Sequence, residues 1–237
     1  MDLYFFCAVD ENPIYRREAE ILIESGRTFG REIHLYDIPA TEVWNRYKVN
    51  LFLADLPPAD RYIYLDSDCC LTGPGDWEAP DCLGVCDVLY YCNTLDRSRH
   101  TKGFMRNHTL LVGEKKGYDY LVQLYLEHGS PPWCNSGVVV LSAADRLPFA
   151  RVWKDWMNPI DAQCEKGFMV GDEGALLVAR QEYGLPLLPP RFNGMCKWQP
   201  IFDWHVLIHA DGNVGGPKRQ PYLDALQRVR NLKEKRS

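Results

Sequence analysis

The chain has 237 residues, of which 46% are hydrophobic and 25% are charged, which is an ordinary composition for a globular protein. This length suits one large domain, or one domain with a small appendage. The formal net charge of −5 argues against a nucleic-acid binder that attracts its ligand through overall positive charge. The nine cysteines are odd in number and form no repeated Cys-x₂-Cys pair. We therefore expect reduced, mostly buried thiols in a cytoplasmic protein.

The N-terminal part of the chain alternates between strand and helix patterns. Residues 3–9 form an apolar run without a basic flank that is too short to span a bilayer, so we expect a strand and no targeting segment. The predicted elements that follow are a helix at 15–25 ended by Gly26, a strand at 32–38, a helix at 41–56 and a strand at 62–65. This order predicts parallel strands joined by right-handed crossovers.

The rest of the chain is less regular, with two domains expected at 1–217 and 218–237. Its predicted elements are strands at 85–91, 138–141 and 206–208, and helices at 118–128, 149–157 and 174–183. Residues 218–237 carry seven Lys or Arg against two acidic residues and have apolar positions at helical spacing. We expect a basic amphipathic helix there, either packed on the domain or docked on a membrane or an anionic acceptor.

Two carboxylates follow the apolar strand at 62–65, one residue apart. Side chains alternate along an extended chain, so Asp66 and Asp68 can point the same way while Ser67 points the other way. Oxygen ligands of this kind suit Mg²⁺ or Mn²⁺, and ligands of open α/β sheets bind at the carboxyl ends of strands. We predict a metal site rather than the turn or helix cap that an isolated Asp-Ser-Asp more often forms.

A histidine follows the last predicted strand and is a candidate third ligand. If the carboxyl ends of the strands meet at one edge, His209 can complete the site begun by the two aspartates. A hydrogen-bonded histidine with no metal is the alternative. Glycines 215 and 216 let backbone amides approach a phosphate, and Lys218 supplies positive charge.

With these motifs in place, the chain resembles a GT-A glycosyltransferase. It is most similar to glycosyltransferase family 8, which includes bacterial lipooligosaccharide galactosyltransferases and glycogenin. The segments that carry the resemblance are Phe6-Cys7-Ala8-Val9-Asp10-Glu11-Asn12, Tyr47-Lys48, Tyr64-Leu65-Asp66-Ser67-Asp68, Asn135-Ser136-Gly137-Val138, Asp172-Glu173 and Ile208-His209-Ala210-Asp211-Gly212. They occur in the family's order and, with Lys218, span almost the whole chain.

The resemblance implies an α/β fold, namely a Rossmann-like three-layer sandwich with a mostly parallel, mixed central sheet. It also implies a retaining hexosyltransferase that uses Mn²⁺ or Mg²⁺, a UDP-sugar donor and a hydroxyl acceptor. Asp66, Asp68 and His209 are the implied metal ligands, and Asp172 and Glu173 lie beside the reacting anomeric carbon. The implied donor contacts are Ala8, Val9, Asp10, Asn12, Lys48, Ser67, Asn135, Ser136, Gly212 and Lys218.

The chain departs from the family's pattern at three positions. Lys48 stands where the family has Arg, and Lys218 lies six residues beyond Gly212, farther than usual. Glu173 replaces the usual Gln. This carboxylate can act as a nucleophile, stabilise an oxocarbenium-like transition state, or be a structural variant paired with Arg180 or Lys197.

Other functions stay open on the sequence alone. A haloacid-dehalogenase-type phosphatase also ends a buried strand with Asp-x-Asp, but it wants Thr or Val where Cys70 stands. Sugar-nucleotide pyrophosphorylases need a Gly-rich loop that is absent after Val9. A nucleotide-sugar-binding module without turnover, or a glycogenin-like self-modifier, are further alternatives. The acceptor can be a lipid-linked saccharide, a protein or, less readily for an acidic protein, a nucleobase, and the enzyme can lie at the inner membrane face.

Overall fold

A computed structural model describes residues 1–42, 44–87, 123, 126–128, 134–163, 171–192, 194–195, 203–210, 223–224, 227 and 231. A five-stranded sheet with the order β2-β1-β3-β6-β5 forms its centre. The strands of this sheet are β1 (Leu3–Val9), β2 (Ile33–Asp37), β3 (Arg61–Leu65), β5 (Gly84–Asp87) and β6 (Cys134–Ser142). The helices of the same region are α1 (Pro13–Thr28), α2 (Trp44–Leu53), α5 (Ala143–Gln163) and α6 (Gly171–Tyr183), and a 3₁₀ turn spans Pro190–Phe192.

The direction of the strands places several candidate residues at one edge of the sheet. β1 pairs in parallel with both β2 and β3, as predicted, whereas β6 runs antiparallel to β3 and to β5. In the β3–β6 ladder Leu65 lies opposite Val138. The first residues of β6 therefore lie just beyond the last residue of β3, beside Asp66. The sheet is mixed and mostly parallel among its first three strands, as the sequence predicts.

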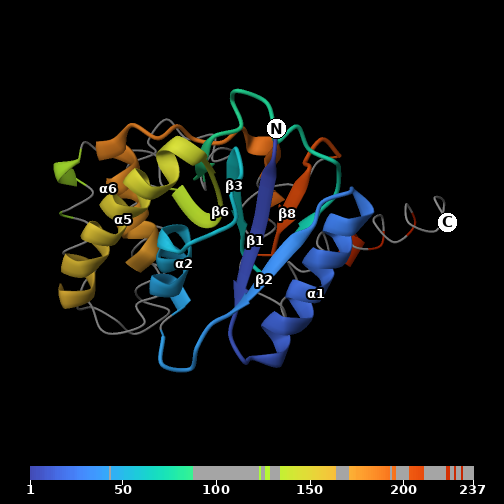
Figure 1. The fold of residues 1–237 in the computed structure, drawn as a ribbon, viewed down its shortest axis with the longest axis horizontal. Helices are drawn as coiled ribbons and strands as arrows, with labels where there is room; N and C mark the ends of the chain where they lie inside the picture. The colour runs from blue at the N-terminus through green and yellow to red at the C-terminus, as the bar shows by residue number, and fades with distance from the viewer. Residues whose placement is uncertain are drawn as a thin grey trace.

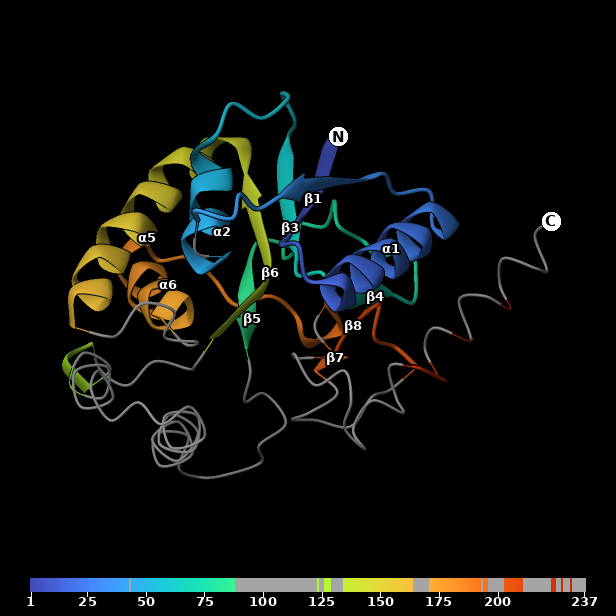
Figure 2. The same cartoon turned by 90° about the horizontal axis from the view of Figure 1, so that it is seen from below.

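The two faces of the sheet are covered by different helices. The side chains of β1 alternate between two apolar clusters, with Tyr4, Phe6 and Ala8 in one and Phe5, Cys7 and Val9 in the other. The first cluster contains residues of α2, α5 and α6, and the second contains residues of α1. Figures 1 and 2 show α1 on one side of the sheet and the other three helices on the opposite side. Each fully buried aromatic or aliphatic side chain contributes about 2 kcal/mol to this three-layer packing.

The four helices differ in their bounds from the predicted ranges 15–25, 41–56, 149–157 and 174–183, and two of these differences have a clear physical reason. α1 continues past Gly26 to Thr28, because Gly26 is buried against the sheet rather than exposed at a turn. A Cβ atom there would lie 2.7 Å from Ile33 Cδ1, so glycine is needed for close packing on β2. α5 begins at Ala143, six residues before its predicted start, where the Ser142 hydroxyl accepts a hydrogen bond from the Asp145 amide at 3.1 Å.

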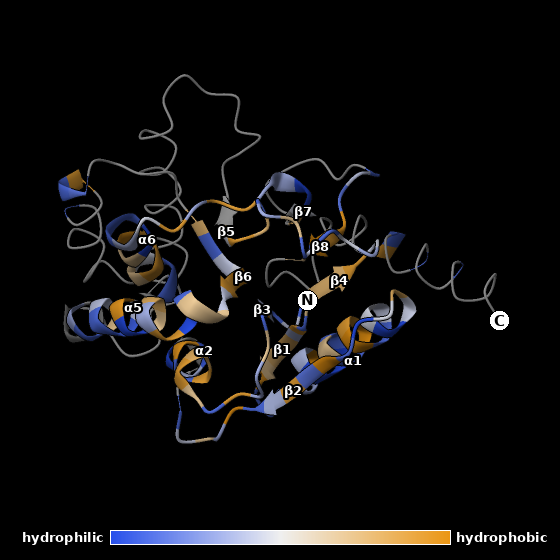
Figure 3. Cartoon of the chain, turned by 45° about the horizontal axis from the view of Figure 1, so that its top comes forward, coloured by the Kyte–Doolittle hydropathy of each residue, from blue (hydrophilic) through white to orange (hydrophobic). Residues whose placement is uncertain are grey.

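A second, smaller sheet brings the C-terminal histidine to the central sheet. It has the order β4-β8-β7 and consists of β4 (Cys69–Leu71), β7 (Gly194–Met195) and β8 (Leu207–His209). β4 starts directly after the Asp66–Asp68 turn and pairs antiparallel with β8, with Cys69 opposite His209. α1 packs on β4, which is strongly apolar in Figure 3, whereas the edge strand β2 is mostly hydrophilic there. The predicted strand at 206–208 is confirmed.

Several expectations concern residues that the structure describes only in part. Most of the predicted helix at 118–128 and most of the predicted strand at 85–91 lie outside the described residues, as does nearly all of the basic segment 218–237 and hence its boundary at 217. Cys7, Cys69, Cys70, Cys82 and Cys134 are buried cysteines outside any disulfide, as expected. None of the helices in the described part combines the length and apolar character that a membrane crossing requires.

Candidate active site

The two carboxylates of the Asp-Ser-Asp segment lie in a tight turn between the two sheets. The amide of Asp66 donates to the carbonyl of Gly137 at 2.8 Å, which continues the β3–β6 ladder by one residue. The amide of Cys69 then donates to the carbonyl of Asp66 at 3.1 Å and closes the turn. Asp68 is buried, whereas Asp66 and Ser67 are partly exposed. The end of β3 thus presents two carboxylates at the edge of the sheet.

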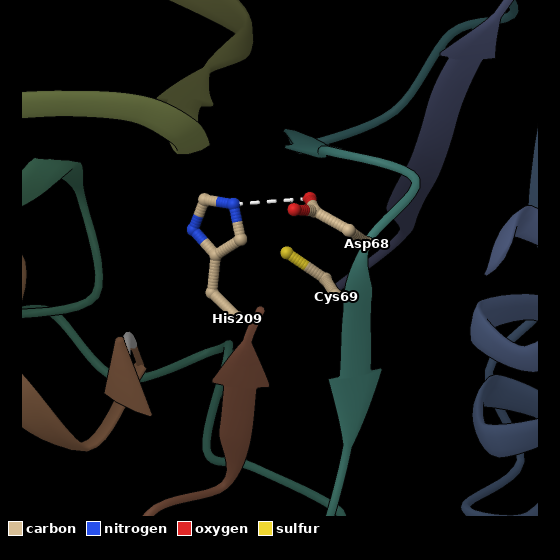
Figure 4. A group of neighbouring side chains, drawn as sticks. All are labelled: Asp68, Cys69 and His209. Carbon is tan, nitrogen blue, oxygen red and sulfur yellow. Dashed lines mark ion pairs between the residues drawn. The ribbon is translucent and has the colours of Figure 1, made fainter. Parts of the chain in front are cut away.

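The imidazole of His209 lies against both carboxylates. Its Nε2 is 3.0 Å from Asp68 Oδ1 and 4.0 Å from Asp66 Oδ2, and the His209 side chain is only 3% exposed. Figure 4 shows the ring pointing from β8 toward Asp68. The backbone fixes this approach, since the Ala210 amide donates to the Asp68 carbonyl at 3.0 Å. The three predicted metal ligands, although far apart in the chain, are brought together; their binding of a metal stays a prediction.

Gly137 is required for this cluster because it has no side chain. A Cβ atom at this position would collide with His209 Cε1 and would lie 2.9 Å from Asp66 Oδ2. The glycine of the Asn-Ser-Gly-Val segment therefore gives the imidazole and the carboxylate the space that they occupy. This role could not be read from the sequence, where Gly137 appeared only as part of a motif.

Lys48 connects Asp66 to the Asp172-Glu173 segment at the start of α6. Its side chain is fully buried, and Nζ lies 2.9 Å from Asp66 Oδ1, 2.8 Å from Ser136 Oγ and 3.4 Å from Asp172 Oδ2. Burial alone would lower the pKa of Lys48, but the charges of Asp66 and Asp172 outweigh burial and raise it to about 12. Lys48 is therefore a permanent cation at neutral pH.

The two candidate catalytic carboxylates on α6 have different surroundings. Asp172 is fully buried, accepts from the Ser136 hydroxyl at 2.6 Å and pairs with Lys48, and its backbone carbonyl accepts from Trp153 Nε1 at 3.1 Å. Glu173 is half-buried and accepts from Asn135 Nδ2 at 2.7 Å. Asn135 also accepts from the Gly137 amide at 2.7 Å, so its amide orientation is fixed from both ends.

Glu173 does not pair with Arg180 in the structure, although the sequence left that pairing open. Arg180 donates from Nη1 to the carbonyl of Leu185 at 3.1 Å, at the opposite end of the same helix. The other partner considered, Lys197, lies outside the described residues. Asn135, at the start of β6, thus orients the Glu173 carboxylate. Glu173 therefore lies at the same edge of the sheet as Asp66.

The residues after β1 form the entry to α1. The Asn12 side chain accepts from the Ile14 amide at 3.0 Å and caps the helix, and the Asn12 amide donates to Asp10 Oδ1 at 2.9 Å. Ala8 and Val9 are buried, and the Val9 carbonyl accepts from the Ile38 amide at 2.9 Å. These contacts form the turn that precedes α1; nucleotide contact by the same residues stays a prediction.

Tyr15 is a residue near the site that sequence reasoning missed. It belongs to the first turns of α1, its side chain is partly exposed, and burial together with the charges of Asp68 and Asp10 raises its pKa. Its hydroxyl is therefore within range of the charges of Asp68, a metal-ligand candidate, and of Asp10, in the loop after β1. The sequence contains one indication of this position: Tyr15 follows the N-cap residue Asn12 by three residues, which is about one helical turn.

The charge of the carboxylate pair is also felt by two buried groups beside it. Burial raises the pKa of the Tyr64 hydroxyl well above its ordinary value, and the Asp66 charge and hydrogen bond raise it further. Burial, then Asp66 and Asp68, raise the pKa of the Cys7 thiol in the same way. Both groups stay neutral and add no negative charge to the cluster. Among the described residues of this cluster, Lys48 carries a positive charge, and His209 carries one when it is protonated.

The donor set fits a divalent cation. The His209 imidazole lies 3.0 Å from the Asp68 carboxylate and 4.0 Å from the Asp66 carboxylate, and the space for the imidazole depends on a glycine that any larger residue would fill. Oxygen and nitrogen ligands of this kind suit Mn²⁺ and, less strongly for the imidazole, Mg²⁺. The other candidate donor contacts, Gly212 and Lys218, lie outside the described residues.

Comparison with known proteins gives structural neighbours only. No protein-family model matches the chain. No curated protein matches it. Among solved structures, it is similar to a glycosyltransferase involved in the glycosylation of the major capsid of PBCV-1, with a TM-score of 0.53 and 12% identity over 99% of this chain and all of the other. The apo form of the glycosyltransferase GlyE of Streptococcus pneumoniae TIGR4 gives a TM-score of 0.55 and 12% identity, and the match covers 99% of this chain and 64% of GlyE. At this identity the likeness shows only the fold, which the chain shares with these two glycosyltransferases.

Proposed function

We propose that the chain is a metal-dependent, retaining glycosyltransferase that moves a hexose from a UDP-sugar to a hydroxyl acceptor. The observation that carries the proposal is the convergence of Asp66, Asp68 and His209 at the carboxyl end of β3, within a fold shared with glycosyltransferases. Ligands of open α/β sheets bind at this edge. Most of the expected donor contacts that are described lie in or next to the ends of β1, β3 and β6, and Lys48 lies on α2.

The leaving group sets the chemical demand on such a site. A nucleoside diphosphate departs with growing negative charge, and a divalent ion held by Asp66, Asp68 and His209 would supply positive charge there. Lys48 adds a permanent positive charge 2.9 Å from Asp66, in a buried position where it is little screened by solvent. Lys218 is the further candidate for a diphosphate contact.

The two α6 carboxylates have separate roles in this proposal. Asp172 forms an ion pair with Lys48 and accepts a hydrogen bond from the Ser136 hydroxyl. It acts as a positioning residue that holds the ammonium group of Lys48 in place. Glu173, oriented by Asn135, is the carboxylate left to face the anomeric carbon. A carboxylate there stabilises an oxocarbenium-like transition state, or it attacks the anomeric carbon from the face opposite the departing diphosphate. Either role is compatible with retention.

The partners follow from the same chemistry. The donor is a nucleotide sugar, for which uridine and a hexose are the proposed nucleoside and sugar, and the acceptor carries a hydroxyl group. The basic segment 218–237 is the proposed contact with an anionic acceptor or with the inner face of a membrane. The proposed donor contacts among the described residues are Ala8, Val9, Asp10, Asn12, Lys48, Ser67, Asn135 and Ser136.

The test is a screen of nucleotide sugars with and without Mn²⁺, read first by thermal shift and then by mass spectrometry of products. We expect Asp68→Asn to abolish sugar release and transfer while the circular dichroism spectrum stays that of the wild type. Asp81→Asn is the matched control, because Asp81 is an exposed carboxylate paired with Arg191 away from the cluster. An Asp68→Asn variant that stays active without metal would contradict the metal assignment. Phosphate release from simple phosphomonoesters would favour the phosphatase alternative instead.

A further inference from the structure

A thiol lies inside the proposed metal site. Asp68, Cys69 and His209 each offer a ligand atom, and these oxygen, sulfur and nitrogen atoms all lie within 4.8 Å of one another. All three residues are buried, and Figure 4 shows the Cys69 sulfur pointing toward the imidazole beneath the Asp68 carboxylate. The Asp-x-Asp pattern points to oxygen ligands alone, so this sulfur changes the chemistry that the site offers.

The backbone explains why the three side chains converge. Cys69 and His209 are directly opposite each other in the antiparallel β4–β8 ladder, and such cross-strand neighbours project from the same face, about 5 Å apart at Cβ. Asp68 precedes the strand, and its carbonyl is held by the Ala210 amide at 3.0 Å. The arrangement is therefore built by strand pairing and does not depend on a bound ion to draw the residues together.

Lys48 makes the Asp66 carboxylate less available to a bound cation than the Asp68 carboxylate. Its ammonium lies 2.9 Å from Asp66 Oδ1, and the other oxygen of Asp66 is 4.0 Å from the imidazole, against 3.0 Å for Asp68. A hard cation such as Mg²⁺ is held mainly by negative charge, which Lys48 reduces. A thiophilic cation gains instead from a sulfur–metal bond, which the ammonium does not weaken to the same extent.

We propose that Asp68, Cys69 and His209 form a binding site for thiophilic divalent cations of the zinc class. Zn²⁺ takes carboxylate, thiolate and imidazole ligands and leaves a fourth position for water. Binding requires the Cys69 thiol to lose its proton, which is released to solvent. Because Asp68 and His209 belong to both ligand sets, and given the proposed function, a zinc-class ion competes with Mn²⁺ or Mg²⁺ and inhibits transfer.

Cobalt substitution tests the ligand set without an activity assay. We expect Co²⁺, added to the metal-free full chain, to produce a near-ultraviolet thiolate-to-cobalt charge-transfer band that Zn²⁺ abolishes and Mg²⁺ does not. Cys69→Ala should lose the band. Since loss of an outer hydrogen-bond partner already costs 10–100-fold in metal affinity, loss of the thiolate should lower Zn²⁺ affinity by at least about a hundredfold in calorimetry.

Cys70→Ala is the matched control. Cys70 is the next residue of β4, is equally buried, and packs in a separate cluster with Ile208 and Ala210. It should keep the charge-transfer band, and Cys69→Ser serves as a second variant that nearly preserves side-chain volume. A wild-type protein without the band at saturating Co²⁺, or a band that persists in Cys69→Ala, overturns the proposal. The wild-type spectrum does not depend on how well any variant folds.

The same measurements separate this proposal from the proposed enzyme activity. If the cobalt band and its loss in Cys69→Ala are observed while no nucleotide sugar is turned over with any metal, the thiophilic site stands and the transferase assignment fails. If transfer occurs with Mn²⁺, is insensitive to Zn²⁺, and the cobalt band is missing, the transferase assignment stands and the thiophilic site is excluded.

Discussion

Replacing Lys48 by Met removes the only described cation that contacts the buried carboxylate of Asp172. The Met side chain keeps the apolar stem but has no ammonium group. Asp172 is fully buried; its Oδ2 then retains only the Ser136 hydroxyl, at 2.6 Å, and its Oδ1 has no hydrogen-bond partner in the described part of the chain. The substitution therefore leaves a nearly uncompensated negative charge in the interior.

The expected cost follows from the burial of this pair. Removing one partner of a buried ion pair destabilises proteins by about 3–5 kcal/mol, which is a large part of a total stability of about 5–15 kcal/mol. The rise in the pKa of Lys48 from 10.5 to about 12 corresponds to about 2 kcal/mol of net favourable interaction with the folded state. The larger figure applies to Lys48→Met because it adds the cost of the orphaned Asp172 charge.

The sign of the pH dependence follows from the same shift. A raised pKa means that the folded state holds the proton more tightly, so this contribution is complete below pH 10.5 and is lost as the pH rises toward about 12. The stability difference between the wild type and Lys48→Met should stay constant from neutral pH to about pH 10 and then shrink.

A double-mutant cycle with Asp172→Asn measures the coupling. We expect Lys48→Met and Asp172→Asn together to be at least about 2 kcal/mol more stable than the sum of the single effects, because the double variant contains neither of the two charges. Urea unfolding followed by tryptophan fluorescence and by circular dichroism gives the free energies. Additive effects, within about 0.5 kcal/mol, would refute the view that the two groups form one buried ion pair.

Two further predictions concern the glycine of the site and a buried arginine of the scaffold. Gly137→Ala should displace the His209 imidazole and weaken Mn²⁺ binding at least about tenfold in calorimetry, with circular dichroism unchanged; unchanged affinity would mean that the imidazole is not a ligand. Arg61→Met should lower the free energy of unfolding by about 3 kcal/mol in urea, because Nη1 donates to the carbonyls of Trp77, Ala79 and Cys82; a loss below about 1 kcal/mol would show that water replaces the guanidinium.

Local patterns were sufficient to predict the strands of the central sheet and the metal-ligand candidates. The apolar run before Asp66 predicted a buried strand, and the expected approach of His209 to Asp66 and Asp68 is also found. β8, however, brings His209 there from the small sheet and not from the edge of the central sheet. The order of elements also predicted the parallel pairing of β1, β2 and β3. These features depend on residues that are close in sequence, or on topology rules that apply to any open α/β sheet.

Long-range pairing decided what could not be predicted. The pairing of β4 with β8 joins residues nearly 140 positions apart, so neither the small sheet nor the position of Cys69 opposite His209 had a local signal. The reversed direction of β6 was hidden for the same reason, and it is what places Asn135 and Ser136 beside β3. Gly26 looked like a helix end because nothing local indicates that it packs against Ile33.

Lysine at position 48 fits the site for a reason that concerns shape as well as charge. An ammonium is a compact charge with three donors, and here it reaches Asp66, Ser136 and Asp172 from a fully buried position. A planar guanidinium, with five donors in a fixed fork, would need more space and more acceptors than these three groups provide. The lysine therefore shares Asp66 with any cation bound by Asp68 and His209. Metal affinity and the stability of the Asp172 pocket are consequently coupled through one ammonium group, and substitutions at position 48 should change both together.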